Sequence, residues 1–185
     1  MRFVETALRG AWLIDLTPAQ DARGYFARSF CMREFADHGL ETSFVQHSTS
    51  YSAKQGTLRG MHFQHPPHSE AKLVNCSKGA IWDVIIDLRP SSSTYRGWQG
   101  FRLTAENRRQ LYIPKGFAHG FQTLCDETEV GYLISEFYMP SAAGGVRYDD
   151  PAFAIQWPLP VTVISEKDAA WSDSKDILSE ISIPK

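Results

Sequence analysis

Short segments rich in β-branched and aromatic residues, separated by turn signals, recur along this chain. The clearest runs from Ala80 to Leu88 and is stopped by Pro90 and a serine cluster. On a strand its two acids, Asp83 and Asp87, fall on one face, while the apolar side chains of Trp82, Val84, Ile86 and Leu88 fall on the other. Short strands broken by turn signals at regular intervals predict a β-sandwich or a β-barrel.

Further segments with this pattern are predicted strands, at residues 44–50, 58–64, 71–75, 97–103, 110–113, 119–124 and 129–137. Helix is predicted only for residues 31–38 and for a C-terminal piece after Ser165. No repeat, low-complexity tract or linker divides the 185 residues, a length that suits one domain with a substantial core. We therefore predict a single all-β domain over residues 1–185, with a jelly roll as the favoured form.

The composition excludes several classes of partner. A formal net charge of −2 leaves no basic excess for nucleic acid. No apolar stretch approaches the ~20 residues that span a bilayer, so no membrane partner is expected. The first residues lack the layout of a signal peptide. The three cysteines are scattered without a CxxC spacing, which indicates reduced thiols and a cytoplasmic location.

A histidine and a lysine stand on two successive predicted strands. If the turn between them centres on Pro67, His62 and Lys72 face each other in a hairpin, with Cβ atoms roughly 4.5–5.5 Å apart. A histidine titrates near neutral pH and a lysine is positively charged, so one can take a proton while the other stabilises the resulting negative charge. Gly60 and Gln64 share the face of His62 and are poor core residues, which indicates a pocket wall. The alternatives are a core histidine and a solvent-facing lysine; the pair together favours catalysis.

A metal site is the main competing interpretation. The segment from Pro114 to His119 reads Pro-x-Gly-x-x-His, which resembles the second motif of the cupins, a jelly-roll superfamily whose metal-binding members carry HxH and a glutamate in the first motif. Here His62 and His65 are three positions apart and would point to opposite faces of a strand. We expect His65 and His68 to be exposed turn residues and no three-histidine metal site to form. A metal-dependent cupin isomerase or dioxygenase stays as the alternative.

Two tyrosines follow the last predicted turn. Tyr132 and Tyr138 are an even number of positions apart and share one strand face. If the turn is tight, Tyr132 lies across from Phe121, on the face of His119. The phenol of Tyr132 could exchange a proton or simply pack, and the sequence alone favours packing.

Three charged residues have two interpretations each. Asp168 ends the segment Ser-Glu-Lys-Asp, which either starts a helix with a capping box or supplies a carboxylate that orients a histidine. Arg23 and Arg59 could form a fork for a phosphate or diphosphate, or lie on the surface. The spacing decides neither question.

Seven motifs, taken in order, resemble the dTDP-4-dehydrorhamnose 3,5-epimerase family from about Asp21 to Asp168. They are Asp-x-Arg-Gly-x-Phe, Leu-Arg-Gly-Met-His-Phe-Gln, Ala-Lys-Leu-Val, Asp-Val-Ile-Ile-Asp-Leu-Arg, Pro-x-Gly-Phe-Ala-His-Gly-Phe, Tyr-x5-Tyr-x-Pro and Ser-Glu-Lys-Asp. The resemblance implies a cupin-type jelly roll with a few short helices, a homodimer, no metal and no redox cofactor. It also implies epimerisation of a nucleotide-linked 4-keto-6-deoxyhexose at C3, C5 or both in deoxysugar biosynthesis, with dTDP as the favoured nucleotide.

Carried over by position, the resemblance assigns a role to each candidate. His62 would be the general base and Asp168 its orienting partner, Lys72 would hold the enolate oxygen, and Tyr132 would be the general acid on the opposite face. The substrate site would be lined by Arg23, Phe26, Gln46, Arg59 and His119, with Arg59 near the diphosphate and Tyr138 stacked on the nucleotide base.

The chain departs from the family pattern at three substrate-binding positions. Arg28 stands where the family usually has a glutamate, Ser48 where it has an asparagine and Ala143 where it often has a glutamate. Our hypothesis is that the reaction type is kept while the specificity for the nucleotide or sugar has moved. Epimerisation at one carbon only, and a non-catalytic sugar-nucleotide binding protein, remain open.

Overall fold

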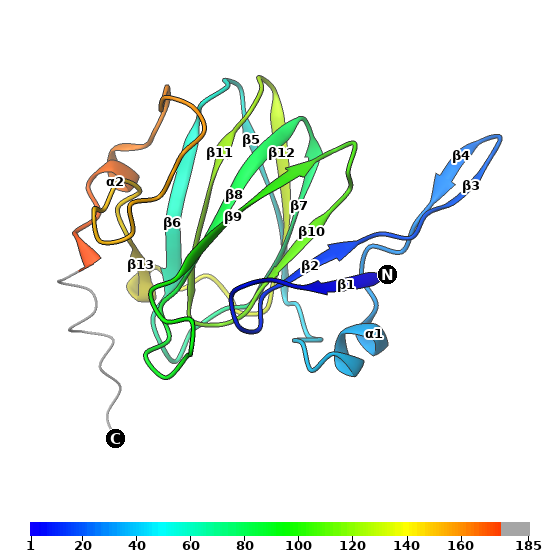
Figure 1. Ribbon diagram of the computed structural model, residues 1–185, viewed down its shortest axis with the longest axis horizontal. Helices are drawn as coiled ribbons and strands as arrows, with labels where there is room; N and C mark the ends of the chain where they lie inside the picture. Colours follow the sequence, from blue (N-terminus) through cyan, green and yellow to red (C-terminus); the bar gives the residue numbers. More distant parts are fainter. Residues whose placement is uncertain (175–185) are drawn as a thin grey trace.

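The computed structural model describes residues 1–174, which fold into two antiparallel β-sheets packed face to face (Figure 1). One sheet has the order β1 (Arg2–Glu5), β2 (Trp12–Asp15), β10 (Gln110–Ile113), β7 (Lys72–Lys78), β12 (Thr128–Ile134) and β5 (Gln46–Ser52). The other has the order β13 (Ala143–Gly145), β6 (Leu58–Gln64), β11 (Phe117–Thr123), β8 (Ala80–Asp87) and β9 (Trp98–Thr104).

The chain passes repeatedly from one sheet to the other. From β5 to β8 every connection crosses the sandwich, β8 and β9 form a hairpin, and from β9 to β13 every connection crosses again. This is the connectivity of a jelly roll, and it confirms the predicted all-β fold class. The strands predicted from the sequence are all present, with ends displaced by a few residues at most. Very short strands, among them β1, β2 and β13, were missed because three or four residues are too few to show an alternating pattern.

Apolar side chains fill much of the space between the sheets. The central cluster takes residues from β7 to β12, among them Val74, Ile81, Leu103, Leu111 and Phe121. The prediction for β8 holds: Ile81 and Ile85 lie on the face of Asp83 and point into this cluster, while Val84 and Ile86 point outward. The outward face is also buried, because residues 146–155 cover it with Val146, Phe153 and Ile155.

The outer face of the six-stranded sheet is covered by the helix α1 (Met32–Asp37), the one predicted at residues 31–38. Its Phe35 is fully buried against Ile14, Leu73 and Tyr112. The predicted C-terminal helix is also present as α2 (Glu166–Ala169), which packs near β6, and a 3-10 turn, η1 (Pro140–Ala142), precedes β13. The single domain predicted for residues 1–185 includes residues 175–185, which lie outside the described part of the chain.

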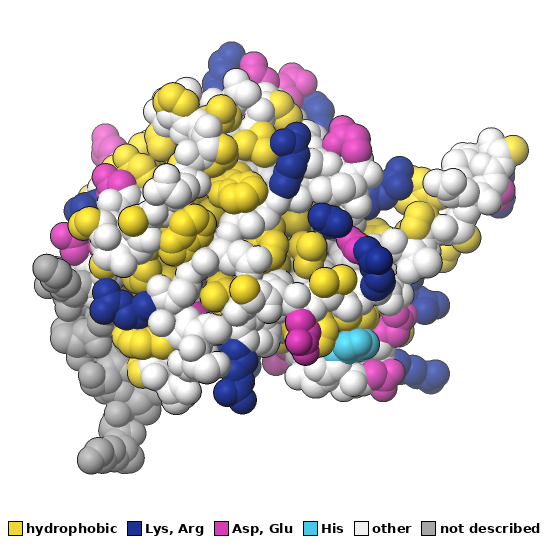
Figure 2. All heavy atoms as spheres, in the orientation of Figure 1, with side chains coloured by type: hydrophobic (Ala, Val, Ile, Leu, Met, Phe, Trp, Pro, Cys, Tyr) yellow, Lys and Arg dark blue, Asp and Glu magenta, His cyan; other side chains and the backbone are white. Residues whose placement is uncertain are grey.

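A two-stranded hairpin of β3 (Ala19–Asp21) and β4 (Gly24–Phe26) projects away from the sandwich (Figure 1). Hydrophobic side chains show on this arm in the space-filling view (Figure 2). Phe26 is 77% exposed and Tyr25 is 51% exposed. Tyr25 is partly covered by the guanidinium of Arg108, which lies 4.2 Å from the centre of its ring.

Two strand pairings expected from the sequence are wrong. β6 and β7 lie in different sheets, so His62 and Lys72 do not face each other in a hairpin; His62 pairs with His119 and Gly145 instead. β11 and β12 are likewise in different sheets, so Tyr132 lies across from Ser48 rather than Phe121. A turn between two strands can close a hairpin or cross a sandwich, and the local sequence does not distinguish these outcomes.

Among residues 1–174, no helix combines the length and the apolar character needed to cross a lipid bilayer. The three cysteines are free thiols. Burial raises the pKa of the Cys76 thiol to about 12.

Candidate active site

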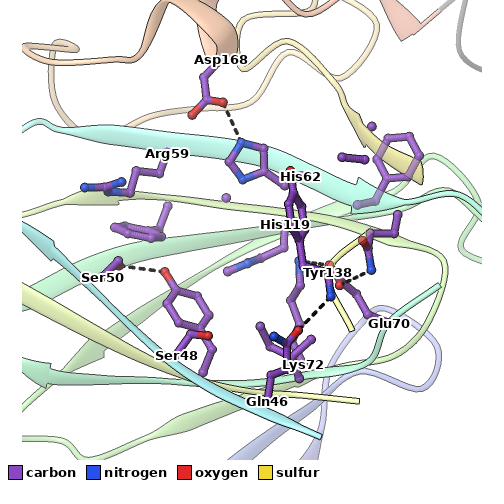
Figure 3. A pocket seen from close by; sticks show the side chains of 18 of the residues that line it. Gln46, Ser48, Ser50, Arg59, His62, Glu70, Lys72, His119, Tyr138 and Asp168 are labelled. Atoms are coloured by element: carbon purple, nitrogen blue, oxygen red, sulfur yellow. Dashed lines mark hydrogen bonds and ion pairs between the residues drawn. The ribbon is translucent and has the colours of Figure 1, made fainter. Parts of the chain in front are cut away.

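A cavity of about 380 Å³ opens between the two sheets (Figure 3). Its walls come from β5, β7 and β12 of one sheet and from β6 and β11 of the other, and α2 lies at its rim. Eight of the residues predicted to form the site line it: Gln46, Arg59, His62, Lys72, His119, Tyr132, Tyr138 and Asp168. His62 and Asp168, for example, are 106 positions apart in sequence and meet because α2 packs near β6.

His62 and Asp168 form a hydrogen-bonded pair at the upper edge of this cavity. The Nε2 atom of His62 lies 2.7 Å from Oδ1 of Asp168. A carboxylate can only accept, so Nε2 carries the proton and Nδ1 is left as the basic atom of the ring. The imidazole remains 43% exposed, whereas the Asp168 side chain is 8% exposed. The imidazole of His62 is therefore open to a ligand, while the carboxylate of Asp168 is shielded.

The Ser-Glu-Lys-Asp segment starts a helix and also supplies a carboxylate to a histidine, but it forms only half of a capping box. Ser165 caps α2, its side chain accepting a hydrogen bond of 3.1 Å from the amide of Asp168. The Asp168 carboxylate does not close a capping box; it accepts from His62 and, at 3.3 Å, from the amide of Gly60. Burial raises the pKa of Asp168, but the hydrogen bonds and the charge of His62 outweigh burial and leave it below its usual range.

Lys72 is buried and is paired with an acid that the sequence did not single out. Its Nζ lies 2.7 Å from Oε1 of Glu70, and the two side chains are 10% and 11% exposed. Glu70 in turn accepts a hydrogen bond of 2.8 Å from Gln64, whose Oε1 accepts from the amide of Met139 at 2.7 Å. This chain of contacts connects the lysine to the segment that carries Tyr138.

A second histidine has its own carboxylate deeper in the cavity. The Nε2–H of His119 donates to both oxygens of Asp83, at 3.0 and 2.9 Å, and Asp83 is fully buried. Burial raises the pKa of Asp83, and the neighbouring His119 only partly offsets this. The sequence pattern places Asp83 on a strand face but indicates no role for it. The signal that could have found it is an acid in the middle of an apolar, doubly buried strand, which requires a partner.

Tyr132 reaches the same cavity from the opposite sheet. Its ring lies edge-on to that of His119, with centroids 6.3 Å apart, and its hydroxyl is 3.0 Å from Oγ of Ser50. Burial raises its pKa, so the phenol keeps its proton across the physiological range. The cavity therefore has a basic nitrogen on one wall and a protonated hydroxyl on the other.

Polar groups at the mouth are held in place by neighbouring strands. Arg59 is fixed by hydrogen bonds to the Ser52 side chain and the Tyr51 carbonyl, at 3.2 and 2.9 Å. Gln46 accepts a hydrogen bond of 2.9 Å from the amide of Tyr138, whose ring is 58% exposed. An exposed aromatic ring can stack on a nucleotide base, and a fixed guanidinium can bind a phosphate.

Arg23 and Phe26 do not reach this cavity. Both belong to the projecting β3–β4 hairpin, where Arg23 pairs with Asp21 at 2.6 Å and its side chain is 90% exposed. Of the two alternatives left open by the sequence, the fork of Arg23 and Arg59 is not formed within one chain, because the hairpin points away from the sandwich.

The remaining histidines lie outside the cavity lining. His65 and His68 were expected to be exposed but are partly buried, and the His65 ring packs on that of Phe63 with centroids 4.9 Å apart. Within residues 1–174, no group of three or more His, Cys, Asp or Glu side chains is arranged to hold a metal ion.

The three departures from the family pattern lie in different surroundings. Ser48 and Ala143 line the cavity, on β5 and β13. Arg28 is outside it and donates a hydrogen bond of 3.2 Å to Glu34.

Comparison with known proteins agrees with the motifs. The sequence matches the family model described as dTDP-4-dehydrorhamnose 3,5-epimerase over residues 5–176. A dTDP-4-dehydrorhamnose 3,5-epimerase from Methanothermobacter thermautotrophicus is 45% identical over 178 residues, covering 95% of this chain and 95% of that protein. One from Mycobacterium tuberculosis is 36% identical, covering 100% of this chain and 93% of that protein.

Solved structures share the fold over nearly the whole length. The dTDP-4-dehydrorhamnose 3,5-epimerase of Bacillus anthracis, with TDP and PPi bound, superimposes with a TM-score of 0.90 at 42% identity, covering 93% of this chain and 98% of that one. The epimerase of Legionella pneumophila in complex with dTDP-4-keto-L-rhamnose gives a TM-score of 0.91 at 36% identity, covering 97% and 96%. The chain therefore belongs to the dTDP-4-dehydrorhamnose 3,5-epimerase family of isomerases.

Proposed function

We propose that this protein epimerises a dTDP-linked 4-keto-6-deoxyhexose at C3, C5 or both, by proton abstraction and reprotonation through an enolate, in deoxysugar biosynthesis. The observation that carries the proposal is the placement of His62 and Tyr132 on opposite walls of one cavity, with Lys72 between the sheets. Inversion of a carbon requires a base on one face and a proton donor on the other.

The chemistry begins at the basic nitrogen. The 4-keto group acidifies the protons on C3 and C5, and Nδ1 of His62 takes one of them. Asp168 holds the imidazole in the correct tautomer and stabilises the imidazolium that forms. The electron pair moves to the C4 oxygen, whose negative charge is stabilised by the ammonium group of Lys72.

The reaction ends with a proton delivered from the other sheet. The hydroxyl of Tyr132 gives its proton to the carbon from the face opposite His62, and the configuration inverts. His119 lies beside the Tyr132 ring, and its pairing with Asp83 fixes its position as part of the substrate site. Glu70 holds the Lys72 ammonium group in place through the ion pair already described.

The nucleotide is assigned from the mouth of the cavity. We place the diphosphate at Arg59 and the base against Tyr138, which Gln46 fixes through its backbone amide. The bound TDP of the Bacillus anthracis structure and the dTDP-sugar of the Legionella pneumophila structure support dTDP.

The number of carbons inverted is a separate question. A 3'-monoepimerase from Streptomyces bikiniensis, in complex with dTDP-quinovose, superimposes with a TM-score of 0.87 at 27% identity, covering 95% of this chain and 90% of that one. The same fold therefore serves one inversion or two. We further propose that the specificity for the nucleotide or sugar differs from that of the family, because Ser48 and Ala143 lie in the cavity wall.

We further propose that the protein is a homodimer in which the β3–β4 hairpin completes the partner's cavity. The support is the exposure of Phe26 and Arg23 on an arm that has no contact with its own cavity. A site that needs these two residues can receive them only from a second copy.

Solvent deuterium exchange tests the reaction. The protein is incubated in D2O with dTDP-4-keto-6-deoxyglucose and with analogues that differ in nucleotide or sugar, and deuterium at C3 and C5 is followed by NMR. We expect uptake with wild-type protein and a loss of at least about 100-fold in His62→Asn, because asparagine keeps a polar side chain at this position but has no basic nitrogen.

The outcomes separate the competing functions. Deuterium uptake at both carbons, with the dTDP sugar clearly preferred, would contradict the hypothesis of altered specificity. Uptake at one carbon would identify a monoepimerase. Tight dTDP binding without exchange on any sugar would favour a binding protein. Activity that depends on a stoichiometric transition metal in the purified protein would favour the metal-dependent alternative.

A further inference from the structure

Trp171 forms part of the cavity wall beside the His62–Asp168 pair and belongs to none of the motifs identified in the sequence. Its indole lies edge-on to the His62 imidazole, with ring centroids 6.4 Å apart and planes at 68°. The Nζ atom of Lys167 lies over the indole, 5.3 Å from the ring centroid. The side chain is thus in contact with the base and flanked by residues of α2.

A glycine makes room for this indole. Gly145 pairs with His62 in the β13–β6 ladder. A Cβ atom at position 145 would lie 2.2 Å from Cε2 of Trp171, well inside contact distance. Any side chain larger than hydrogen here would therefore push the indole away from the strand that carries the base.

The segment after Trp171 is anchored by two residues near the start of the loop that follows β13. The amide of Ser174 donates a hydrogen bond of 2.6 Å to Asp150, which is 2% exposed. Asp173 pairs with Arg147 at 2.9 Å. These contacts fix the backbone that positions the indole, so Trp171 is held against the site by more than its own packing.

The indole N–H is shielded from solvent on the cavity wall that also carries Asp168. Its Nε1 atom is fully buried and finds no partner of full hydrogen-bond geometry within residues 1–174. Burial raises the pKa of Asp168, and His62 and the Gly60 amide lower it. Trp171 also lowers this pKa, by less than those two groups. A buried donor beside a carboxylate stabilises its charged form and replaces water there.

We propose that Trp171 is a positioning residue for the His62–Asp168 pair, its indole fixing the plane of the imidazole and keeping water from the Asp168 carboxylate. It acts through the pair and not on the substrate. The kinetic consequence rests on the proposed function, because it requires His62 to be the base. The structural consequence, a protected hydrogen bond between His62 and Asp168, does not.

Trp171→Phe tests the kinetic consequence, because phenylalanine keeps an aromatic ring but loses the N–H and the width of the indole. Trp98→Phe is the matched control: Trp98 is also partly buried but packs on the outer face of the five-stranded sheet, away from the cavity. We expect kcat to fall about 10- to 100-fold in Trp171→Phe with KM within about twofold, since small misplacement of a base costs this much. The control keeps wild-type kcat. An unchanged kcat, or a change in KM alone, would overturn the proposal.

Proton NMR tests the structural consequence without turnover. The His62 Nε2–H resonance is assigned by its loss in His62→Asn, and its exchange with water is measured in wild type and in both tryptophan variants. We expect exchange to be at least about tenfold faster in Trp171→Phe and unchanged in Trp98→Phe. Equal exchange rates in all three proteins would overturn the role proposed for Trp171, whether or not the protein inverts a sugar. A wild-type protein that inverts no sugar would overturn the proposed function and leave this measurement unaffected.

A second variant guards against misfolding. If Trp171→Phe loses its cooperative thermal transition, Gly145→Ala displaces the indole without removing it. We expect the same fall in kcat and the same faster exchange in the folded variant. Wild-type behaviour of Gly145→Ala in both measurements would contradict the role of the indole.

Discussion

The two aspartates that pair with histidines in the cavity have pKa values shifted in opposite directions. Asp168 accepts hydrogen bonds from His62 and from the Gly60 amide, and these keep its pKa below the usual range despite burial. Asp83 is fully buried with His119 as its hydrogen-bond partner, and burial raises its pKa. Burial dominates at the completely buried Asp83, whereas at the less deeply buried Asp168 the hydrogen bonds and the charge of His62 outweigh burial. Asp168 is therefore the carboxylate that stays charged beside the exposed imidazole.

Asp168→Asn should lower kcat about 100-fold while leaving dTDP affinity unchanged. An asparagine amide can donate to Nε2 of His62, which shifts the ring proton to Nδ1 and removes the basic atom. Steady-state kinetics and isothermal titration with dTDP measure the two effects. Glu166→Gln, on the exposed face of the same short helix, is the control and should match wild type. Full activity in Asp168→Asn would mean that Asp168 does not set the tautomer.

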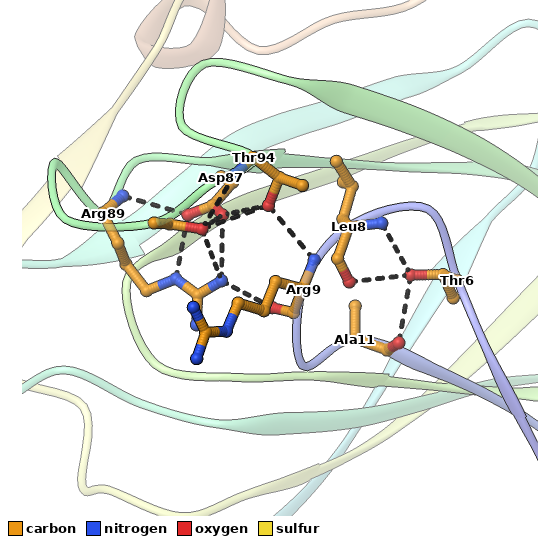
Figure 4. A network of polar contacts seen from close by, with 8 residues as sticks. Thr6, Leu8, Arg9, Ala11, Asp87, Arg89 and Thr94 are labelled. Atoms are coloured by element: carbon orange, nitrogen blue, oxygen red, sulfur yellow. Dashed lines mark hydrogen bonds and ion pairs between the residues drawn. The ribbon is translucent and has the colours of Figure 1, made fainter.

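At the scale of the element, strand β8 is anchored at its end by a buried carboxylate. Asp87 accepts hydrogen bonds from the Arg89 backbone and guanidinium and from the hydroxyls of Ser92 and Thr94 (Figure 4). The guanidinium of Arg89 also donates a hydrogen bond to the carbonyl of Arg9, in the connection between β1 and β2 (Figure 4). The network ties the loop after β8 to the edge of the other sheet. Burial raises the pKa of Asp87, but these donors outweigh it, so its pKa lies below the usual range.

Asp87→Asn should lower the free energy of unfolding by about 3 kcal/mol at pH 7, because it leaves a half-buried guanidinium without its charged partner. A carboxylate with a lowered pKa stabilises the fold above its unfolded pKa of about 3.9, and that contribution is lost as the pH falls through the folded value. The difference between wild type and variant should therefore be constant from pH 7 to 5 and shrink below about pH 4. Urea unfolding at several pH values measures it.

The control for this prediction is an exposed ion pair. Glu127 pairs with Lys78 at 3.1 Å, with side chains 65% and 54% exposed. Glu127→Gln should change the free energy of unfolding by less than about 0.5 kcal/mol. If the difference for Asp87→Asn did not vary with pH, the charge of the carboxylate would not be its source.

At the scale of the whole molecule, the projecting hairpin makes a prediction about two chains together. One variant carries both Arg23→Ala and Phe26→Ala and is defective in the hairpin. The other carries His62→Asn and is defective in the base. The two variants are mixed. Each homodimer should be inactive. In a mixed dimer the intact hairpin of the His62→Asn chain completes the cavity of the chain that retains His62, giving one working site of two.

Co-refolding of equal amounts of the two variants should restore about a quarter of wild-type activity, because half of the dimers are mixed and each has one intact site. Light scattering checks that both variants and the mixture are dimers. Mixed dimers without recovered activity would show that the hairpin does not act in the partner's cavity, and a monomeric wild type would remove the basis of the prediction.

The sequence alone was enough to predict most of the strands, the all-β class and eight of the side chains that line the cavity. Alternation of apolar and polar residues is a local property and reports which face of a strand a side chain occupies. Gly60, His62 and Gln64 were placed on one face in this way, and the ordered motifs identified the family. The helix start at Ser165 was likewise readable, because capping depends on neighbouring residues.

The tertiary structure decided which strands face each other. Alternation gives a face but no partner, so the expected hairpin of His62 and Lys72 was wrong; the two reach the cavity from opposite sheets. The partners Glu70, Asp83 and Trp171, and the separation of Arg23 from Arg59, follow from packing between segments distant in the chain. Such contacts depend on how two twisted sheets stack and where the chain crosses between them, which no local pattern encodes.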